Sequence, residues 1–249
     1  MTMLRKATFA ALAAPLVLAL AACGSGNDET AADVAGDPID PVAAPEGQQW
    51  MEVAVETEEG GYRIGNPDAP LKLLEFASLT CPHCADFAEE ARAGIDAYVN
   101  DGTVSYELRN QIHDPLDLTM SMLTRCGTVE SFHPLSNQVW DNLQEIVGAV
   151  QANPEALNKA VQAPAEQRYE KIAEAAGLLD FFAARGISRD QAKECLAQPE
   201  MAEQIVEESN TQSEEMDVTG TPTFFLNGRK LDGNTWAAIE ADLQQAGAR

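Results

Sequence analysis

Basic residues are scarce in this chain of 249 residues, which has 16 lysines and arginines against 40 aspartates and glutamates. The formal net charge is −24. Nucleic acids and anionic lipid surfaces attract proteins mainly through lysine and arginine, so this charge argues against both as partners. The surplus of acid favours solubility and identifies no partner by itself.

Long apolar segments are also few. Near the start, Arg5 and Lys6 precede an apolar stretch over residues 7–20. This stretch is too short for a membrane-spanning helix, which needs about 20 apolar residues. A basic start followed by a short apolar stretch is typical of an export signal, which we assign to residues 1–22.

The end of this signal, Leu20-Ala21-Ala22-Cys23, resembles a bacterial lipobox. In such signals the cysteine becomes the lipidated first residue of the mature protein. The pattern therefore predicts a lipoprotein held through Cys23 at the periplasmic face of a bacterial membrane. Ordinary cleavage after Ala21 is the alternative, and it would give a soluble periplasmic protein.

Residues 23–49 contain no lysine or arginine and few large apolar side chains. Such a segment buries too little apolar surface to offset its ordering entropy, so we expect a lipid anchor site followed by a disordered acidic linker. The lack of basic residues excludes a second, electrostatic membrane anchor. Residues 50–249 are enough for one domain that carries an insertion.

The chain has only five cysteines. If Cys23 carries the lipid, four cysteines remain, which is an even number. In an exported protein an even number favours disulfides. Cys81 and Cys84 pair through their close spacing, so Cys126 and Cys195 are left for each other. We interpret the latter pair as a structural disulfide worth about 4 kcal/mol, with a second redox relay as the alternative.

The chain alternates between strand and helix patterns around residue 80. Residues 71–77 are predicted to form a strand, 82–98 a helix with an apolar stripe, and 103–110 a half-buried strand. This order predicts a parallel βαβ unit. From 116 to 216 the pattern is helical, and prolines and glycines divide it into six or seven short helices.

Strand patterns return near the end of the chain. Residues 223–226 and 229–231 flank Asn227-Gly228, which is a strong hairpin signal. Thr235 is predicted to cap a final helix that runs to about Gln245. The layout βαβ, helical block, ββα predicts an α/β thioredoxin fold, with its parts at 50–112 and 213–249 and an all-helical insertion at 113–212.

The first strand leads directly into Cys81-Pro82-His83-Cys84 at the start of a helix. Unpaired backbone N–H groups at a helix start stabilise a thiolate, and proline suits the first helical position. We expect His83 to donate a hydrogen bond or positive charge towards the Cys81 sulfur. A redox pair is therefore favoured over half of a zinc or copper site and over an inert bridge.

Two further features support a redox site. Glu75 lies inside the apolar strand, six residues before Cys81, where a carboxylate is costly unless it has a task or a partner. The alternative is an acid at the strand end that reaches solvent. Far along the chain, Gly220-Thr221-Pro222 precedes the hairpin.

Cys-Pro-His-Cys after a Glu-Phe strand, combined with Gly-Thr-Pro-Thr-Phe-Phe before the hairpin, resembles the DsbA-like branch of the thioredoxin superfamily. The resemblance implies a cis peptide before Pro222, a backbone at Thr221 that pairs with substrate, and a second disulfide in the helical block. It also implies a quinone-linked membrane protein that reoxidises the enzyme. Threonine before the proline is shared with isomerase and reductase branches, and the lipobox suggests a membrane-tethered variant.

The sequence therefore predicts a periplasmic enzyme that introduces disulfides into exported client proteins with free thiols, without organic cofactor or resident metal. A reductase or isomerase of the same fold is the first alternative, and a Cu(I)-handling lipoprotein is the second. The dimeric isomerases carry a folded N-terminal dimerisation domain, for which the segment before the fold is too short and too polar, so we expect a monomer.

Overall fold

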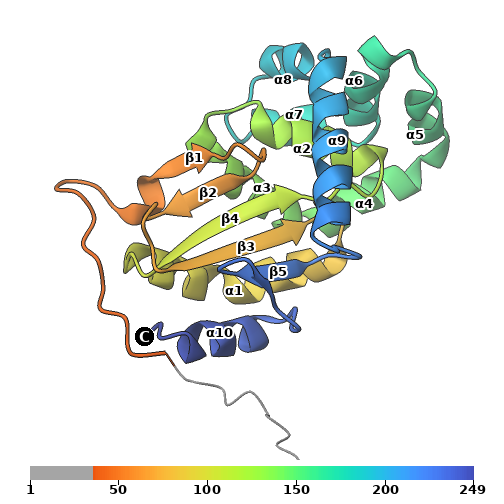
Figure 1. The fold of residues 1–249 in the computed structure, drawn as a ribbon. Helices are drawn as coiled ribbons and strands as arrows, with labels where there is room; N and C mark the ends of the chain where they lie inside the picture. The colour runs from red at the N-terminus through yellow and green to blue at the C-terminus, as the bar shows by residue number, and fades with distance from the viewer. Residues whose placement is uncertain (1–35) are drawn as a thin grey trace, which may run out of the picture. The chain divides into compact units, whose positions relative to one another are not determined.

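The computed structural model describes residues 36–249, which form a mixed six-stranded sheet packed against helices (Figure 1). The strand order is β1-β2-β4-β3-β5-β6, and only the central pair β3 and β4 is parallel. The strands are β1 (Ala54–Glu56), β2 (Tyr62–Gly65), β3 (Leu71–Ala77), β4 (Val104–Asn110), β5 (Thr223–Leu226) and β6 (Arg229–Lys230).

The centre of the fold is the predicted βαβ unit. Helix α1 (Pro82–Asn100) connects β3 to β4, and the parallel register pairs Leu73 with Tyr106. The helix buries Phe87, Ala91 and Ile95, which form the apolar stripe that its sequence predicts. Because β3 lies between β4 and β5, its residues are covered on both edges, and the Cys81 turn follows the end of a central strand.

The C-terminal segment adds the hairpin and the last helix. Asn227 and Gly228 have φ of +50° and +80°, as a type I′ turn requires. Helix α10 (Trp236–Gln245) lies beside α1 on one side of the sheet (Figure 1). A Cβ at Gly94 of α1 would come within 2.1 Å of the Trp236 ring, so the absence of a side chain there allows the close approach.

A block of helices lies between β4 and β5 in the chain, where the helical insertion is predicted. Its members are α2 (Pro115–Arg125), the short 3₁₀ helix η2 (Val129–Ser131), α3 (Phe132–Asp141), α4 (Leu143–Ala152), α5 (Pro154–Val161), α6 (Ala165–Ala175), α7 (Leu178–Ala183), α8 (Arg189–Leu196) and α9 (Pro199–Glu215). These are eight α-helices rather than six or seven. The break at Asn142, with φ −118° and ψ 14°, has no proline or glycine to mark it in the sequence.

One disulfide ties this block together. It joins Cys126, at the C-terminal end of α2, to Cys195 in α8, with 5.9 Å between their Cα atoms. This is the pair that the sequence analysis assigned to each other. The two cysteines are 69 residues apart, so the bridge constrains a long loop of the unfolded chain.

The prediction of a disordered linker is wrong for residues 36–49, the part of that segment that the structure describes. These residues form no helix or strand, but the Gly36 and Ile39 N–H groups donate to the carbonyls of Gln245 and Gly247. The indole N–H of Trp50, in the 3₁₀ helix η1 (Trp50–Glu52), donates to the Val42 carbonyl at 2.6 Å. Backbone hydrogen bonds thus order a segment that its composition alone would leave free.

The signal peptide predicted at 1–22 and the lipid site at Cys23 lie outside the described residues. Among residues 36–249, no helix combines the length and apolar character needed to cross a bilayer.

Candidate active site

Cys81 occupies the N-cap of α1, where its sulfur accepts a hydrogen bond from the backbone N–H of Cys84 at 3.4 Å. The chain is extended at Cys81 (φ −82°, ψ 118°), and Pro82 begins the helix without needing a donor. Both cysteines are free thiols, and Cys81 is 7 % exposed while Cys84 is completely buried. Cys81 is therefore the sulfur that a substrate can reach.

The loop between β3 and Cys81 is held by Asp117 of α2, a buried carboxylate that the sequence analysis did not single out. It accepts hydrogen bonds from the Ser78 hydroxyl at 2.7 Å, the Leu79 N–H at 2.8 Å and the His113 N–H at 2.9 Å. Burial raises its pKa to about 6. Asp117 thus fastens the helical block to the segment that positions the reactive cysteine.

The Thr221–Pro222 peptide bond is cis, as the family resemblance implies. In its protonated form Cys81 donates a hydrogen bond to the Thr221 carbonyl at 3.4 Å, although the two residues are 140 positions apart. Pro222 is buried, whereas Gly220 is exposed and its carbonyl accepts from the Thr223 hydroxyl at 2.7 Å. The structure therefore brings the two sequence motifs together as one site.

Glu75 is 1 % exposed, so the alternative of an acid that reaches solvent is wrong. Its Oε2 accepts a hydrogen bond from the hydroxyl of Tyr106. Tyr106 is on the neighbouring strand β4, and its side chain lies on the same face of the sheet as that of Glu75. Its Oε1 has no hydrogen-bond partner among the described residues. Burial raises the pKa of Glu75 to about 8, so this carboxyl group is largely protonated at neutral pH.

The two active-site thiols differ sharply in acidity. Hydrogen bonds from the Cys84 thiol, the Thr221 side chain and the backbone N–H groups of Cys84 and His83 lower the pKa of Cys81 to about 5. Burial, followed by the hydrogen bond to Cys81, raises the pKa of Cys84 well above its ordinary value. At neutral pH Cys81 is a thiolate and Cys84 is a thiol.

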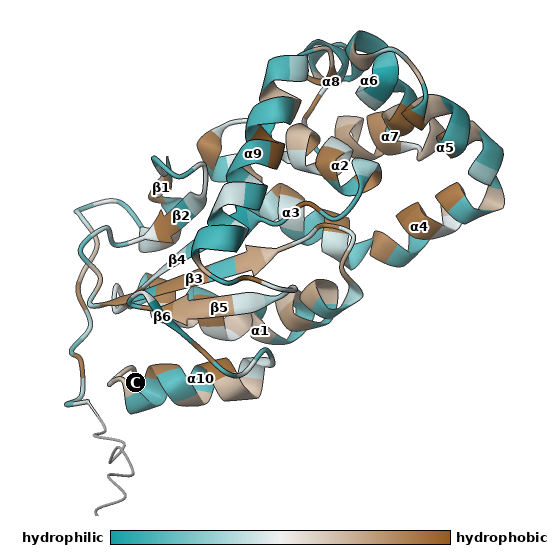
Figure 2. Cartoon of the chain, turned by 45° about the vertical axis from the view of Figure 1, so that its right-hand side comes forward, coloured by the Kyte–Doolittle hydropathy of each residue, from teal (hydrophilic) through white to brown (hydrophobic). Residues whose placement is uncertain are grey.

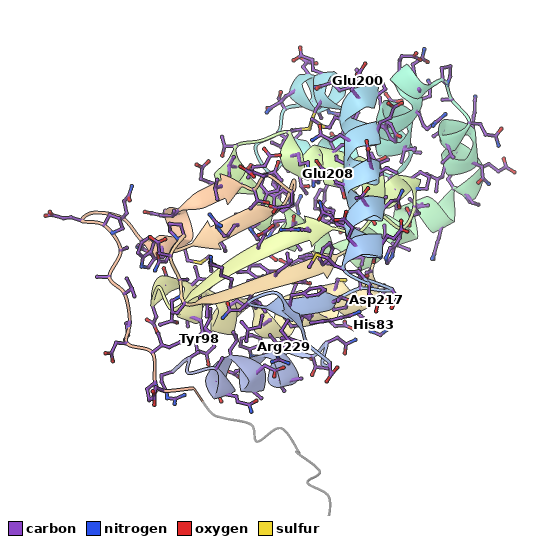
Figure 3. The ribbon with its side chains drawn as sticks, viewed as in Figure 1. His83, Tyr98, Glu200, Glu208, Asp217 and Arg229 are labelled. Carbon is purple, nitrogen blue, oxygen red and sulfur yellow. A yellow bond between two sulfur atoms is a disulfide. The ribbon has the colours of Figure 1, made fainter. Side chains whose placement is uncertain are left out.

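The side chain of His83 does not take the place predicted for it. Its imidazole is 82 % exposed, and Nδ1 lies 3.8 Å from the carboxylate of Asp86 (Figure 3). The contribution of His83 to the Cys81 thiolate comes from its backbone N–H. The imidazole, at the second position of α1, is instead turned into solvent beside Asp86, one turn further along the helix.

A thioredoxin family model matches residues 57–245. The crystal structure of protein-disulfide isomerase from Novosphingobium aromaticivorans has a TM-score of 0.69 and 31 % identity, covering 74 % of this chain and 97 % of that one. The structure of alpha-DsbA1 from Wolbachia pipientis has a TM-score of 0.60 and 20 % identity, covering 74 % and 89 %. The chain belongs to the thioredoxin family.

A Rickettsia bellii protein named "Putative protein-disulfide oxidoreductase" is 23 % identical over 198 residues, which cover 79 % of this chain and 68 % of that protein. Together with the 31 % identical disulfide isomerase, this places the chain among the thiol-disulfide oxidoreductases. Residues 36–249 contain no group of three or more histidine, cysteine or acidic side chains that could hold a metal ion.

An apolar groove of about 630 Å³ opens beside Cys81. One end is formed by Cys81, Pro82 and Thr221. The wall beyond them comes from the helical block, through side chains that are apolar and at least half-buried: Leu116, Val147, Val150, Leu157 and Val161. Figure 2 shows α4, which supplies Val147 and Val150, as one of the more hydrophobic helices.

The sequence analysis missed three residues of the site, namely Tyr106, Asp117 and His113. Tyr106 and Asp117 belong to no motif, because each meets its partner only through the tertiary fold. His113 is exposed and lines the groove beside Cys81. His133, by contrast, is buried and bonds the Tyr62 carbonyl at 2.8 Å.

Proposed function

We propose that the protein introduces disulfides into exported proteins, using Cys81 and Cys84 as the exchanged disulfide. The observation that carries this proposal is the unequal setting of the two sulfurs: Cys81 accepts a backbone N–H at the N-cap of α1, and Cys84 is fully buried behind it. A stabilised Cys81 thiolate favours the reduced enzyme, so the Cys81–Cys84 disulfide is a strong acceptor of electrons from client thiols.

In the oxidised enzyme, a client thiolate attacks the Cys81 sulfur and breaks the Cys81–Cys84 bond. Cys84 leaves as a thiolate and takes a proton, for which the protonated Glu75 is the nearby buried source. A second thiolate of the client then attacks the client sulfur that is bonded to Cys81. This forms the client disulfide and releases Cys81 as a thiolate. Two client thiols are oxidised to one disulfide, and the enzyme disulfide is reduced to two thiols.

The groove gives the client a place to bind. It runs without interruption from Cys81 and Thr221 to the apolar side chains of α4 and α5, and the Thr221 backbone lies at its edge. An extended polypeptide with apolar residues next to its cysteine fits this shape, because main-chain pairing at a loop edge and apolar contacts do not depend on one sequence. Unfolded exported proteins with free thiols are substrates of this kind.

Cellular location and reoxidation complete the proposal. The lipobox at Leu20–Cys23 supports an export route with a lipid on Cys23 at the periplasmic face of a bacterial membrane. A quinone-linked membrane protein would take the electrons, as the family resemblance implies. Intact-mass measurement of membrane-extracted protein should show a diacylated Cys23, and a chain that begins at unmodified Ala22 would contradict the anchor.

An isomerase or reductase is the second candidate function. It is favoured by Thr221 before the cis proline and by the name of the Novosphingobium aromaticivorans relative, which is 31 % identical. The same thiols would serve, but the reduced enzyme would attack incorrect disulfides of the client.

Single-turnover oxidation tests the proposal. Oxidised protein is mixed with an equal amount of a reduced peptide that carries two cysteines, and the products are followed by mass spectrometry. We expect one peptide disulfide per protein and full reduction of Cys81 and Cys84. If the peptide stays reduced while the reduced protein rearranges a scrambled substrate, the isomerase is the correct assignment.

A further inference from the structure

Two chain segments form the end of the groove that is nearest to the reactive sulfur. The first is the loop after β3, which contributes Thr80, Cys81 and Pro82. The second runs from the end of β4 into α2 and contributes residues 113–116. The distance between the two segments determines the width of the groove beside Cys81, where a client has to enter.

Asp117, which directly follows the second segment, joins it to the first. Its Oδ1 accepts a hydrogen bond from the Leu79 N–H at 2.8 Å, and its Oδ2 accepts one from the Ser78 hydroxyl at 2.7 Å. Both donors belong to the loop after β3. Oδ2 also accepts from the His113 N–H at 2.9 Å, which holds the start of the second segment. One carboxylate therefore bonds both sides of the groove.

The loop that Asp117 holds leads directly to the reactive cysteine. The Ser78 carbonyl accepts a hydrogen bond from the Cys81 N–H at 3.3 Å. Another bond between the two segments, from the Thr80 hydroxyl to Oδ2 of Asp114 at 3.1 Å, is exposed, so water competes for it. Asp117 is 0 % exposed, and water cannot replace its bonds. The buried carboxylate is the stronger of the two connections.

The charge of Asp117 is compensated by these contacts alone. Among residues 36–249 it forms no ion pair. Its three hydrogen-bond donors, and its place in the first turn of α2 at the positive helix end, offset the cost of burial. An asparagine could not do the same, because its amide group donates hydrogen bonds and would face a donor of the loop.

We propose that Asp117 is a positioning residue that sets the width of the client groove beside Cys81. With the carboxylate in place, the loop after β3 and residues 113–116 keep one spacing, and without it they separate. An extended client that contacts both segments then binds more weakly, whereas a small thiol needs only the Cys81 sulfur. This inference rests on the proposed function, which assigns the groove to the client, and it holds for either direction of electron flow.

Reduction of the oxidised protein by two reductants tests the proposal. One is a peptide with two cysteines and apolar neighbours, which can occupy the groove, and the other is dithiothreitol, which is too small to span it. In Asp117→Asn the peptide rate constant divided by the dithiothreitol rate constant should fall about tenfold, the effect of leaving a buried donor unpaired. The loss should appear as a higher half-saturating peptide concentration, with little change in the rate at saturation.

Thr103→Val is the matched control. The Thr103 hydroxyl is also buried, and it donates to the Tyr98 carbonyl at 3.2 Å, near the end of α1 opposite to Cys81. Its loss should weaken the fold without changing the ratio of the two rate constants. Ser78→Ala removes one of the three bonds to Asp117 and should lower the ratio about threefold. It carries the test if circular dichroism shows that Asp117→Asn does not fold.

An unchanged ratio in Asp117→Asn and Ser78→Ala, or an equal loss of both rate constants, would overturn the role of Asp117 in client binding. Failure of the proposed function has a different signature, which appears already in the wild type. There the rate would rise linearly with peptide concentration and never saturate, and this would contradict the groove as the client site.

Discussion

The protein contains two cysteine pairs in opposite helix environments. Cys81 and Cys84 lie at the N-terminal start of α1, where backbone N–H groups point at sulfur. Cys126 and Cys195 lie at the C-terminal ends of α2 and α8, where the exposed groups are carbonyls. The Cys126 sulfur is 3.1 Å from the Met122 carbonyl oxygen, and the Cys195 sulfur is 3.6 Å from it.

This difference explains how one chain keeps one pair reactive and the other inert. N–H donors and the positive helix end stabilise a thiolate, and they therefore favour the reduced Cys81. Carbonyl oxygens and the negative helix end destabilise a thiolate, and they therefore favour the disulfide between Cys126 and Cys195. The position of a cysteine on its helix, rather than its burial, separates exchange chemistry from a structural bridge.

The largest expected effect separates the pairs by activity. Cys81→Ala should reduce oxidation of a dithiol peptide to the uncatalysed background, because no other reachable sulfur within residues 36–249 stands at a helix start. The matched variant Cys126→Ala/Cys195→Ala should keep most of the wild-type rate at a temperature where it is folded. Residual catalysis by Cys81→Ala would show that the second pair exchanges electrons too.

Thr221→Arg tests whether the reactive pair depends on the loop beside it. A long charged side chain at the edge of the groove should block an extended client and reduce kcat/KM on the order of 100-fold. The thermal midpoint should change little, since Thr221 is only half-buried. Unchanged turnover of a peptide substrate would count against Thr221 as the substrate-facing residue.

Glu75→Gln tests the proton store behind Cys84. The pKa of Glu75 is about 8 in the folded protein and near 4.5 in the unfolded chain, so its contribution to stability is complete below about pH 4.5 and is lost as the pH rises through 8. Wild type should therefore lose several kcal/mol relative to Glu75→Gln across this range. Denaturant unfolding at several pH values measures the difference, and parallel curves for the two proteins would refute it.

The inert pair should contribute stability instead. Cys126→Ala/Cys195→Ala should lower the free energy of unfolding by about 4 kcal/mol, because the bridge closes a loop of 69 residues. Denaturant unfolding of both proteins at one pH checks the value. A loss below about 1 kcal/mol would mean that the helical block is held by packing alone.

Much of the reactive site is predictable from the sequence because its parts are local. The strand Leu71–Ala77, the Cys-Pro-His-Cys turn and the Asn227-Gly228 hairpin each follow from neighbouring residues. The parts of the site that the sequence does not predict are contacts between residues far apart in the chain. Tyr106 meets Glu75 only through strand register, and His113 meets Thr221 across 108 residues. The direction in which the His83 side chain points is also not written in the spacing.

The ordered conformation of residues 36–49 is a second feature that depends on distant contacts. Composition predicts disorder there, and the hydrogen bonds that order the segment come from the far C-terminal end, at Gln245 and Gly247. Local patterns cannot show a partner 200 residues away.

The reduction potential of the Cys81–Cys84 pair tests the central claim most directly. Equilibration of Cys126→Ala/Cys195→Ala and wild type with glutathione buffers isolates the active-site pair. The stabilised Cys81 thiolate predicts a potential between about −180 and −120 mV in both proteins, the range of known disulfide-forming enzymes. A value near −270 mV, typical of thioredoxin, would contradict the account.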